Sequence, residues 1–73
     1  MSWKSEVQQV INEICSVGDI FTIDNVYAYR DYFKKLYPKN NHVDDKIRQT
    51  LQFLRDDGYL EFSDDNGVYK RLV

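Results

Sequence analysis

Apolar residues recur at helical spacing in three segments of this chain, the first of which lies close to its start. In segment 4–16, Val7, Val10, Ile11 and Ile14 occupy positions i, i+3, i+4 and i+7. This spacing places all four side chains on one stripe of an amphipathic helix. The segment is therefore predicted to be a helix that packs one face on a core.

A second helix is predicted from Thr22 to about Leu36. Its apolar stripe consists of Val26, Tyr29, Phe33 and Leu36. Lysines in the last turn suit the negative end of the helix dipole, and the proline that follows opposes continuation.

A third helix is predicted over 43–57. Val43, Ile47, Leu51 and Leu54 repeat at i, i+4, i+8 and i+11, so one face of this helix is expected to be buried. The remaining faces are polar and are left for solvent or a ligand.

Residues that favour helix ends accompany all three segments. Ser2 and Thr22 are suited to accept a hydrogen bond from the first turn of the helix that follows, and Asn40 or Asn41 is expected to do the same for the third helix. Gly58 follows the third helix where a chain often leaves a helix through a left-handed conformation.

The C-terminal part of the chain predicts a β-hairpin. YLEFS and VYKRLV alternate apolar and polar residues around the turn 64–67. A four-residue loop at 64–67 sets Phe62 opposite Tyr69 and Glu61 opposite Lys70, and both are favourable cross-strand pairs.

This order of elements predicts an α+β fold, a winged helix-turn-helix with three helices, a C-terminal hairpin wing and a short third strand at 20–22. An isolated hairpin is only marginally stable, so the third strand matters. The alternative is a three-helix bundle that carries the hairpin as an appendix.

Size and composition narrow the possible functions. Seventy-three residues and 8.8 kDa allow one domain over 1–73. The single cysteine, Cys15, and single histidine, His42, exclude an internal disulfide and a Cys/His zinc cage, so no metal or cofactor is expected. No apolar run is long enough to span a bilayer and no signal core opens the chain, which favours the cytoplasm.

Charge is distributed unevenly. The whole chain has a net charge of −2, yet 30–48 holds six basic residues against three acidic ones and is locally +3. Any DNA binding must therefore come from a local patch. The residues expected to contact phosphate are Arg30, Lys34, Lys35, Lys39, Arg48, Lys70 and Arg71.

In helix-turn-helix proteins the second helix of the motif enters the major groove. Here that helix is the third one, and Asn or Gln side chains bind adenine bidentately. The residues expected to contact bases are Asn40, Asn41, His42, Asp45, Lys46, Gln49 and Gln52. The alternative for the two asparagines is that they only turn the chain and cap the helix.

The tip of the wing carries Asp64 and Asp65, which repel phosphate. The wing is therefore expected to stay off the DNA or to contribute only Lys70 and Arg71.

Three segments carry a family resemblance: FTIDNVYAY, LYPKNNHVDDKIRQTLQFLRDDGYLEF and VYKRL. They resemble the C-terminal winged-helix domain of DpnI-like methyl-directed restriction endonucleases and of the related Dam-replacing endonucleases. In that family the domain binds DNA and follows a separate metal-dependent nuclease domain, and the DpnI type targets adenine-methylated GATC. The residues that match the start of the family's recognition helix are Asn40, Asn41, His42, Lys46, Arg48 and Gln49.

Catalysis by this chain alone is not expected, because it has no second histidine and no glycine-rich phosphate loop. The resemblance implies double-stranded DNA as the partner, and the chain is then either a domain with a covalently linked nuclease or a free-standing relative. Among oligomeric states a monomer is favoured. A different hypothesis is a protein-interaction or dimerisation winged helix without DNA binding. The net negative charge, the acidic wing and Trp3 at the exposed start of the chain motivate it.

Overall fold

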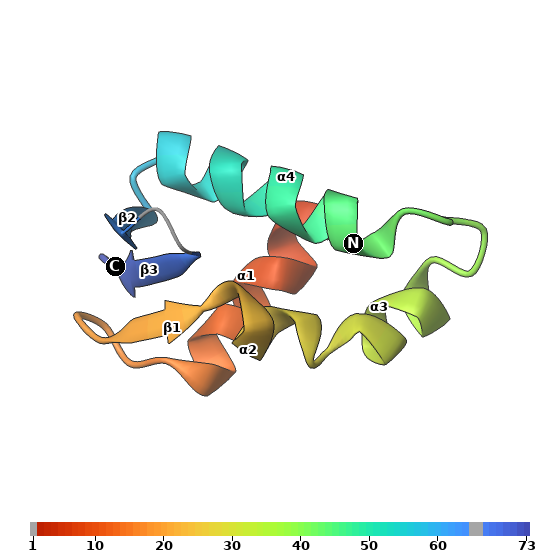
Figure 1. Ribbon diagram of the computed structural model, residues 1–73, viewed down its shortest axis with the longest axis horizontal. Coiled ribbons are helices and arrows are strands. Elements are labelled where there is room, and N and C mark those ends of the chain that lie inside the picture. The colour runs from red at the N-terminus through yellow and green to blue at the C-terminus, as the bar shows by residue number, and fades with distance from the viewer. Residues whose placement is uncertain (1, 65–66) are drawn as a thin grey trace.

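The computed structural model of the protein (Figure 1) describes residues 2–64 and 67–73, which form four helices and three strands. The α+β class and the winged helix-turn-helix architecture predicted from the sequence are confirmed. In chain order the elements are α1 (Trp3–Ile14), β1 (Ile20–Thr22), α2 (Ile23–Tyr27), α3 (Arg30–Leu36), α4 (Val43–Asp56), β2 (Leu60–Asp64) and β3 (Val68–Arg71).

Two of the predicted helix caps are present as capping boxes. The side chain of Ser2 accepts a hydrogen bond from the Ser5 backbone N–H, and the Ser5 hydroxyl in turn accepts one from the Ser2 N–H. Thr22 and Asn25 form the same reciprocal pair at the start of α2. Each box satisfies backbone donors that a helix start otherwise leaves unpaired.

The predicted second helix is wrong in one respect, because the chain forms two short helices, α2 and α3, where one was expected. At Tyr29 the backbone leaves the helical region (φ −97°, ψ 13°), and its N–H binds the Val26 carbonyl three residues back. On the two sides of the break, Val26 in α2 and Phe33 in α3 are both wholly buried.

The start of α4 also differs from the prediction. His42, rather than Asn40 or Asn41, occupies the N-cap position, and its side chain makes no capping bond. The Asn40 side-chain oxygen instead accepts a hydrogen bond from the His42 N–H at 2.8 Å. Asn40 therefore forms an Asx turn with His42, immediately before the helix begins.

The end of α4 is a Schellman motif around Gly58, whose φ is +80°. The Gly58 N–H binds the Arg55 carbonyl and the Tyr59 N–H binds the Leu54 carbonyl. This motif satisfies two of the last carbonyls of the helix. It also leads the chain directly into β2.

The core lies between α1, α4 and the inner face of the sheet. Val43, Ile47, Leu51 and Leu54 of α4 are all buried, as predicted. The three α1 residues that pack with them in one cluster are Val7, Val10 and Ile11. Thr50 also points into this core, and its hydroxyl donates to the Lys46 carbonyl at 2.6 Å. The buried stripe fixes which side of α4 faces outward.

The sheet has the strand order β1–β3–β2 and is antiparallel throughout. Phe62 pairs with Tyr69 and Glu61 with Lys70, so the predicted register is confirmed. The short strand β1 joins the hairpin through β3, also as predicted. The predicted four-residue loop 64–67 is wrong at its start, because Asp64 belongs to β2 and pairs with Val68 after a register shift between Phe62 and Asp64. Asp65 lies outside the described residues.

Candidate nucleic-acid interface

The outward face of α4 is polar from Asp45 to Gln52 and is followed by the exposed Phe53. Asp45, Arg48, Gln49 and Gln52 are all exposed and lie opposite the buried stripe. This follows from helix geometry, because residues three or four positions apart share a face. The core contacts of α4 therefore present these four side chains together.

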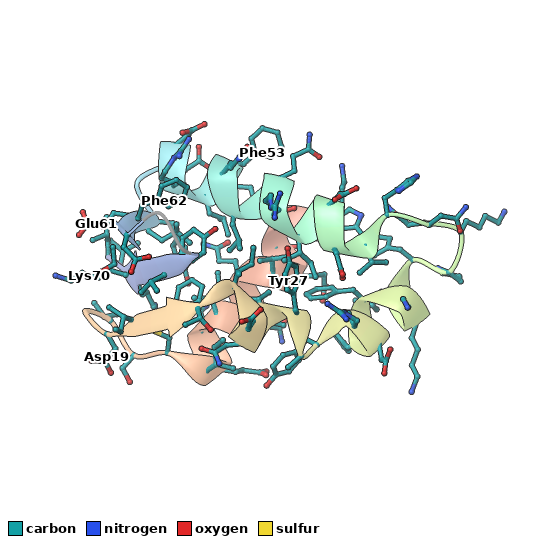
Figure 2. The ribbon with its side chains drawn as sticks, viewed as in Figure 1. Asp19, Tyr27, Phe53, Glu61, Phe62 and Lys70 are labelled. Atoms are coloured by element: carbon teal, nitrogen blue, oxygen red, sulfur yellow. The ribbon has the colours of Figure 1, made fainter. Side chains whose placement is uncertain are left out.

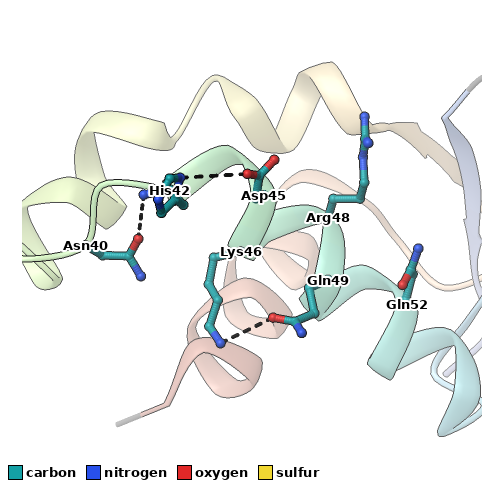
Figure 3. Close-up of a pocket in the computed structure, with 7 residues that line it drawn as sticks. All are labelled: Asn40, His42, Asp45, Lys46, Arg48, Gln49 and Gln52. Atoms are coloured by element: carbon teal, nitrogen blue, oxygen red, sulfur yellow. Dashed lines mark hydrogen bonds and ion pairs between the residues drawn. The ribbon is translucent and has the colours of Figure 1, made fainter.

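Seven residues on this side line one shallow hollow (Figure 3), and six of them were predicted to contact bases. The hollow brings together Asn40, His42, Asp45, Lys46, Arg48, Gln49 and Gln52. Arg48, expected to contact phosphate, is the seventh. Asn41 is the predicted base-contacting residue that lies elsewhere: it lines a neighbouring hollow with Arg30 and Lys34.

Interactions within the hollow orient its side chains. The Lys46 ammonium donates to the Gln49 side-chain oxygen at 3.3 Å, and His42 Nδ1 lies 3.9 Å from a carboxylate oxygen of Asp45 (Figure 3). The His42 and Asp45 side chains are 81% and 84% exposed. These contacts are open to water and easily exchanged, so the donors and acceptors remain available to base edges.

The predicted phosphate contacts divide into those near α4 and those far from it. Lys34 and Lys35 on α3, and Lys39 in the turn that follows, are exposed beside the N-terminal half of α4. Arg30 lies over the Tyr27 ring, 5.3 Å from its centroid, and pairs with Asp44. The three lysines thus flank the start of α4, where phosphate contacts orient a recognition helix.

Lys70 and Arg71 lie apart from this group. The Arg71 guanidinium donates to the Cys15 carbonyl at 2.7 Å and to the Val73 carbonyl at 2.8 Å, so the fold itself uses its donors. Lys70 alternates with the buried Tyr69 and therefore points to the outer face of the sheet, together with Glu61 (Figure 2). Neither cation joins the polar face of α4.

Arg55 and Phe62 form a contact that was not among the site residues predicted from the sequence. The Arg55 guanidinium lies over the Phe62 ring, 4.4 Å from its centroid, where the end of α4 meets β2. A signal existed, because Arg55 follows Arg48 by seven residues, two helical turns along the same side. The aromatic partner lies on another element and was not visible in that spacing.

The remaining reactive groups serve the fold. Burial raises the pKa of the Cys15 thiol, which keeps it protonated and weakly nucleophilic. Trp3, expected to be exposed, stacks on Tyr37 with ring centroids 4.4 Å apart and is only partly accessible.

Over residues 2–64 and 67–73, no three His, Cys, Asp or Glu side chains gather as metal ligands. None of the described helices has the length and hydropathy of a membrane span.

A comparison with protein families identifies the chain. The Dam-replacing HTH domain family matches residues 1–71, which is nearly the full sequence. The chain belongs to this family. The Dam-replacing HTH domain is a DNA-binding module rather than a catalytic one. The family assignment and the polar face of α4 therefore agree on DNA as the partner of this domain.

Proposed function

We propose that this Dam-replacing domain recognises a specific sequence in duplex DNA by placing the polar face of α4 in the major groove. The observation that carries the proposal is the hollow along α4 and the turn before it, in which amide, imidazole and cationic side chains lie together. Such side chains match the donor and acceptor pattern of base edges in the major groove. The buried stripe on the opposite side holds the helix in place.

Four residues of the hollow contact bases in this proposal. Gln49 and Gln52 are exposed amides suited to adenine, and Lys46 is suited to guanine O6 and N7. Asp45 accepts a hydrogen bond from a cytosine amino group. Lys34, Lys35 and Lys39 hold the adjoining backbone and fix the register of the helix.

The biological setting is also part of the proposal. We propose that the domain serves a type II restriction endonuclease of the cytoplasm, as a monomeric recognition module linked to a nuclease domain. The target is a GATC-type site, with adenine methylation as the feature to be tested. The resemblance to DpnI-like enzymes supports these points. A protein-docking role has less support, because Trp3 packs against Tyr37 and Phe33 instead of standing free.

Fluorescence anisotropy tests the proposal with methylated GATC, unmethylated GATC and scrambled duplexes at two salt concentrations. The variant is K46A/Q49A, and the matched control is K4A/Q9A, which removes the same residue types from α1. We expect the wild-type chain to prefer one GATC duplex, with a slope of log K against log salt of about −3. K46A/Q49A should abolish the preference and K4A/Q9A should retain it. Equal behaviour of the two double variants would refute the placement of α4.

A further inference from the structure

One flank of α4 carries a row of arginines that the proposed function uses only in part. Asp44, Arg48 and Arg55 stand at i, i+4 and i+11, which is a single stripe along this helix. Arg30 of α3 joins the row through its ion pair with Asp44. We call Arg30, Arg48 and Arg55 the arginine row. It follows the edge of α4 that faces α2, α3 and the wing.

Two of the three arginines of this row stack on aromatic rings. Arg30 lies over Tyr27 and Arg55 over Phe62, while Phe62 meets Tyr69 edge-on with centroids 5.2 Å apart. Burial, followed by the nearby Tyr27 phenol, raises the pKa of Tyr69, and the charges of Arg48 and Arg55 oppose that rise. Arg55 contacts the wing directly through the Phe62 ring of β2.

The pair at the end of the row is open to solvent. The Arg55 side chain is 39% exposed and Phe62 is 42% exposed. Phe62 lies on the same sheet face as the buried Leu60 but beyond the edge of the core. A phenylalanine side chain this exposed adds little to the hydrophobic core, so core packing does not account for Phe62. Its contact with Arg55 therefore calls for another explanation.

We infer that Arg55, seated on the Phe62 ring, binds a backbone phosphate of duplex DNA on the wing side of α4. The inference rests on the proposed function, because it requires α4 to lie in the groove. A helix in the major groove has a phosphate backbone along each side. In this arrangement Lys34, Lys35 and Lys39 contact the phosphate backbone beside the start of α4. The arginine row contacts the backbone on the side of α4 next to the wing. The part of the wing nearest the DNA is then Phe62 in β2, and not the acidic residues at the tip of the wing.

The chemistry of Arg55 suits this role. Its guanidinium gives Nε–H and one Nη2–H to Asp56, and the Nη1 donors have no partner within the described residues. A planar guanidinium with free donors binds phosphate well, and stacking on a ring restricts its orientation in advance.

Asp56 is the group that opposes this contact. Its carboxylate lies 3.2 Å from the Arg55 guanidinium, and its side chain is 64% exposed. Exposed pairs of this kind are weak and exchange readily. A phosphate therefore competes with Asp56 for the same cation, and removal of the Asp56 charge should strengthen DNA binding.

The test is a set of anisotropy titrations of the full chain with the GATC and scrambled duplexes over a range of salt. Arg55→Gln should weaken binding about tenfold to both duplexes. It should also make the salt slope shallower by about one. Phe62→Leu should weaken binding about two- to fivefold. Asp56→Asn should tighten it. The matched controls are Lys4→Gln and Glu13→Gln on α1, and circular dichroism verifies the folding of every variant.

The outcomes separate this inference from the proposed function. If Arg55→Gln behaves like Lys4→Gln while K46A/Q49A loses binding, the phosphate site is refuted and the placement of α4 stands. A loss confined to the GATC duplex with an unchanged salt slope also refutes it, because that pattern belongs to a base contact. If the wild-type chain binds no duplex, both proposals fail.

Discussion

Arg30 and Asp44 form an ion pair, with Nη2 and Oδ2 3.0 Å apart, that ties α3 to the first turn of α4. Both side chains are nearly half exposed. The carboxylate favours the positive end of the helix dipole, so it helps α4 to begin at this point. It also places a negative charge beside Arg30, a cation predicted from the sequence to contact phosphate. We therefore expect the pair to stabilise the helix and to weaken DNA binding.

The variant Asp44→Asn separates these two effects. We expect its affinity for duplex DNA to rise about two- to fivefold, because Arg30 is released and a repulsive charge is lost. Its unfolding free energy should fall by about 0.3–1 kcal/mol through the lost dipole interaction. Anisotropy and thermal unfolding measure the two quantities. Asp19→Asn, which removes the same charge away from α4, is the control, and equal affinities of the two variants would count against this assignment of Arg30.

Substitutions at two glycines test how closely the wing approaches α2. Both have left-handed backbone angles, with φ +82° at Gly67 and +87° at Gly18. A Cβ at Gly67 would lie 2.8 Å from Ile23 Cγ2, whereas one at Gly18 meets nothing within 4 Å. Gly18→Ala should therefore cost only the backbone strain, about 1 kcal/mol. Gly67→Ala should cost about 2–3 kcal/mol, because overpacking adds to that strain. Urea unfolding compares them, and equal losses would contradict the close approach at Gly67.

The two faces of α4 should respond differently to small changes. Ile47 is wholly buried and Phe53 is 52% exposed on the same helix. Ile47→Val should lower the unfolding free energy by about 0.5–1.5 kcal/mol. Phe53→Leu should change it by less than about 0.5 kcal/mol. Thermal melts check both values. A larger loss from Phe53→Leu would mean that α4 is rotated relative to the orientation described here.

Stability should decline at alkaline pH. Burial raises the pKa of Tyr59 and Tyr69 in the folded chain. The unfolded chain therefore loses these phenolic protons first, and unfolding becomes easier as pH rises above about 10. The stabilisation is complete below that pH. Urea midpoints measured between pH 8 and 11 should fall with pH, and Tyr69→Phe should make the fall shallower. An identical pH dependence in Tyr69→Phe would contradict the role of this phenol.

The sequence predicted those features that follow from local period and spacing. The stripe from Val43 to Leu54 fixed both the buried and the polar face of α4, and the alternation around Phe62 fixed the register with Tyr69. The capping boxes at Ser2 and Thr22 involve residues only three positions apart. Interactions of this range can be inferred without knowledge of the tertiary structure.

The remaining features depend on elements that are distant in the sequence. The break at Tyr29 left no trace in the apolar spacing, because Val26 and Phe33 are seven residues apart and would share a face in an unbroken helix too. Arg71 was predicted to contact phosphate, yet the fold brings its guanidinium to the Cys15 carbonyl, 56 residues away. The pairing of Arg55 with Phe62 is likewise set by how α4 packs on the sheet.

The most direct test of the central claim is a nuclear magnetic resonance titration of the ¹⁵N-labelled chain with a GATC duplex. Side-chain amide signals of Asn40, Gln49 and Gln52 report on the polar face of α4, and that of Gln9 reports on α1. We expect large shifts for the three α4-side amides and little change for Gln9. Shifts concentrated at Gln9, with the α4-side amides unmoved, would contradict it.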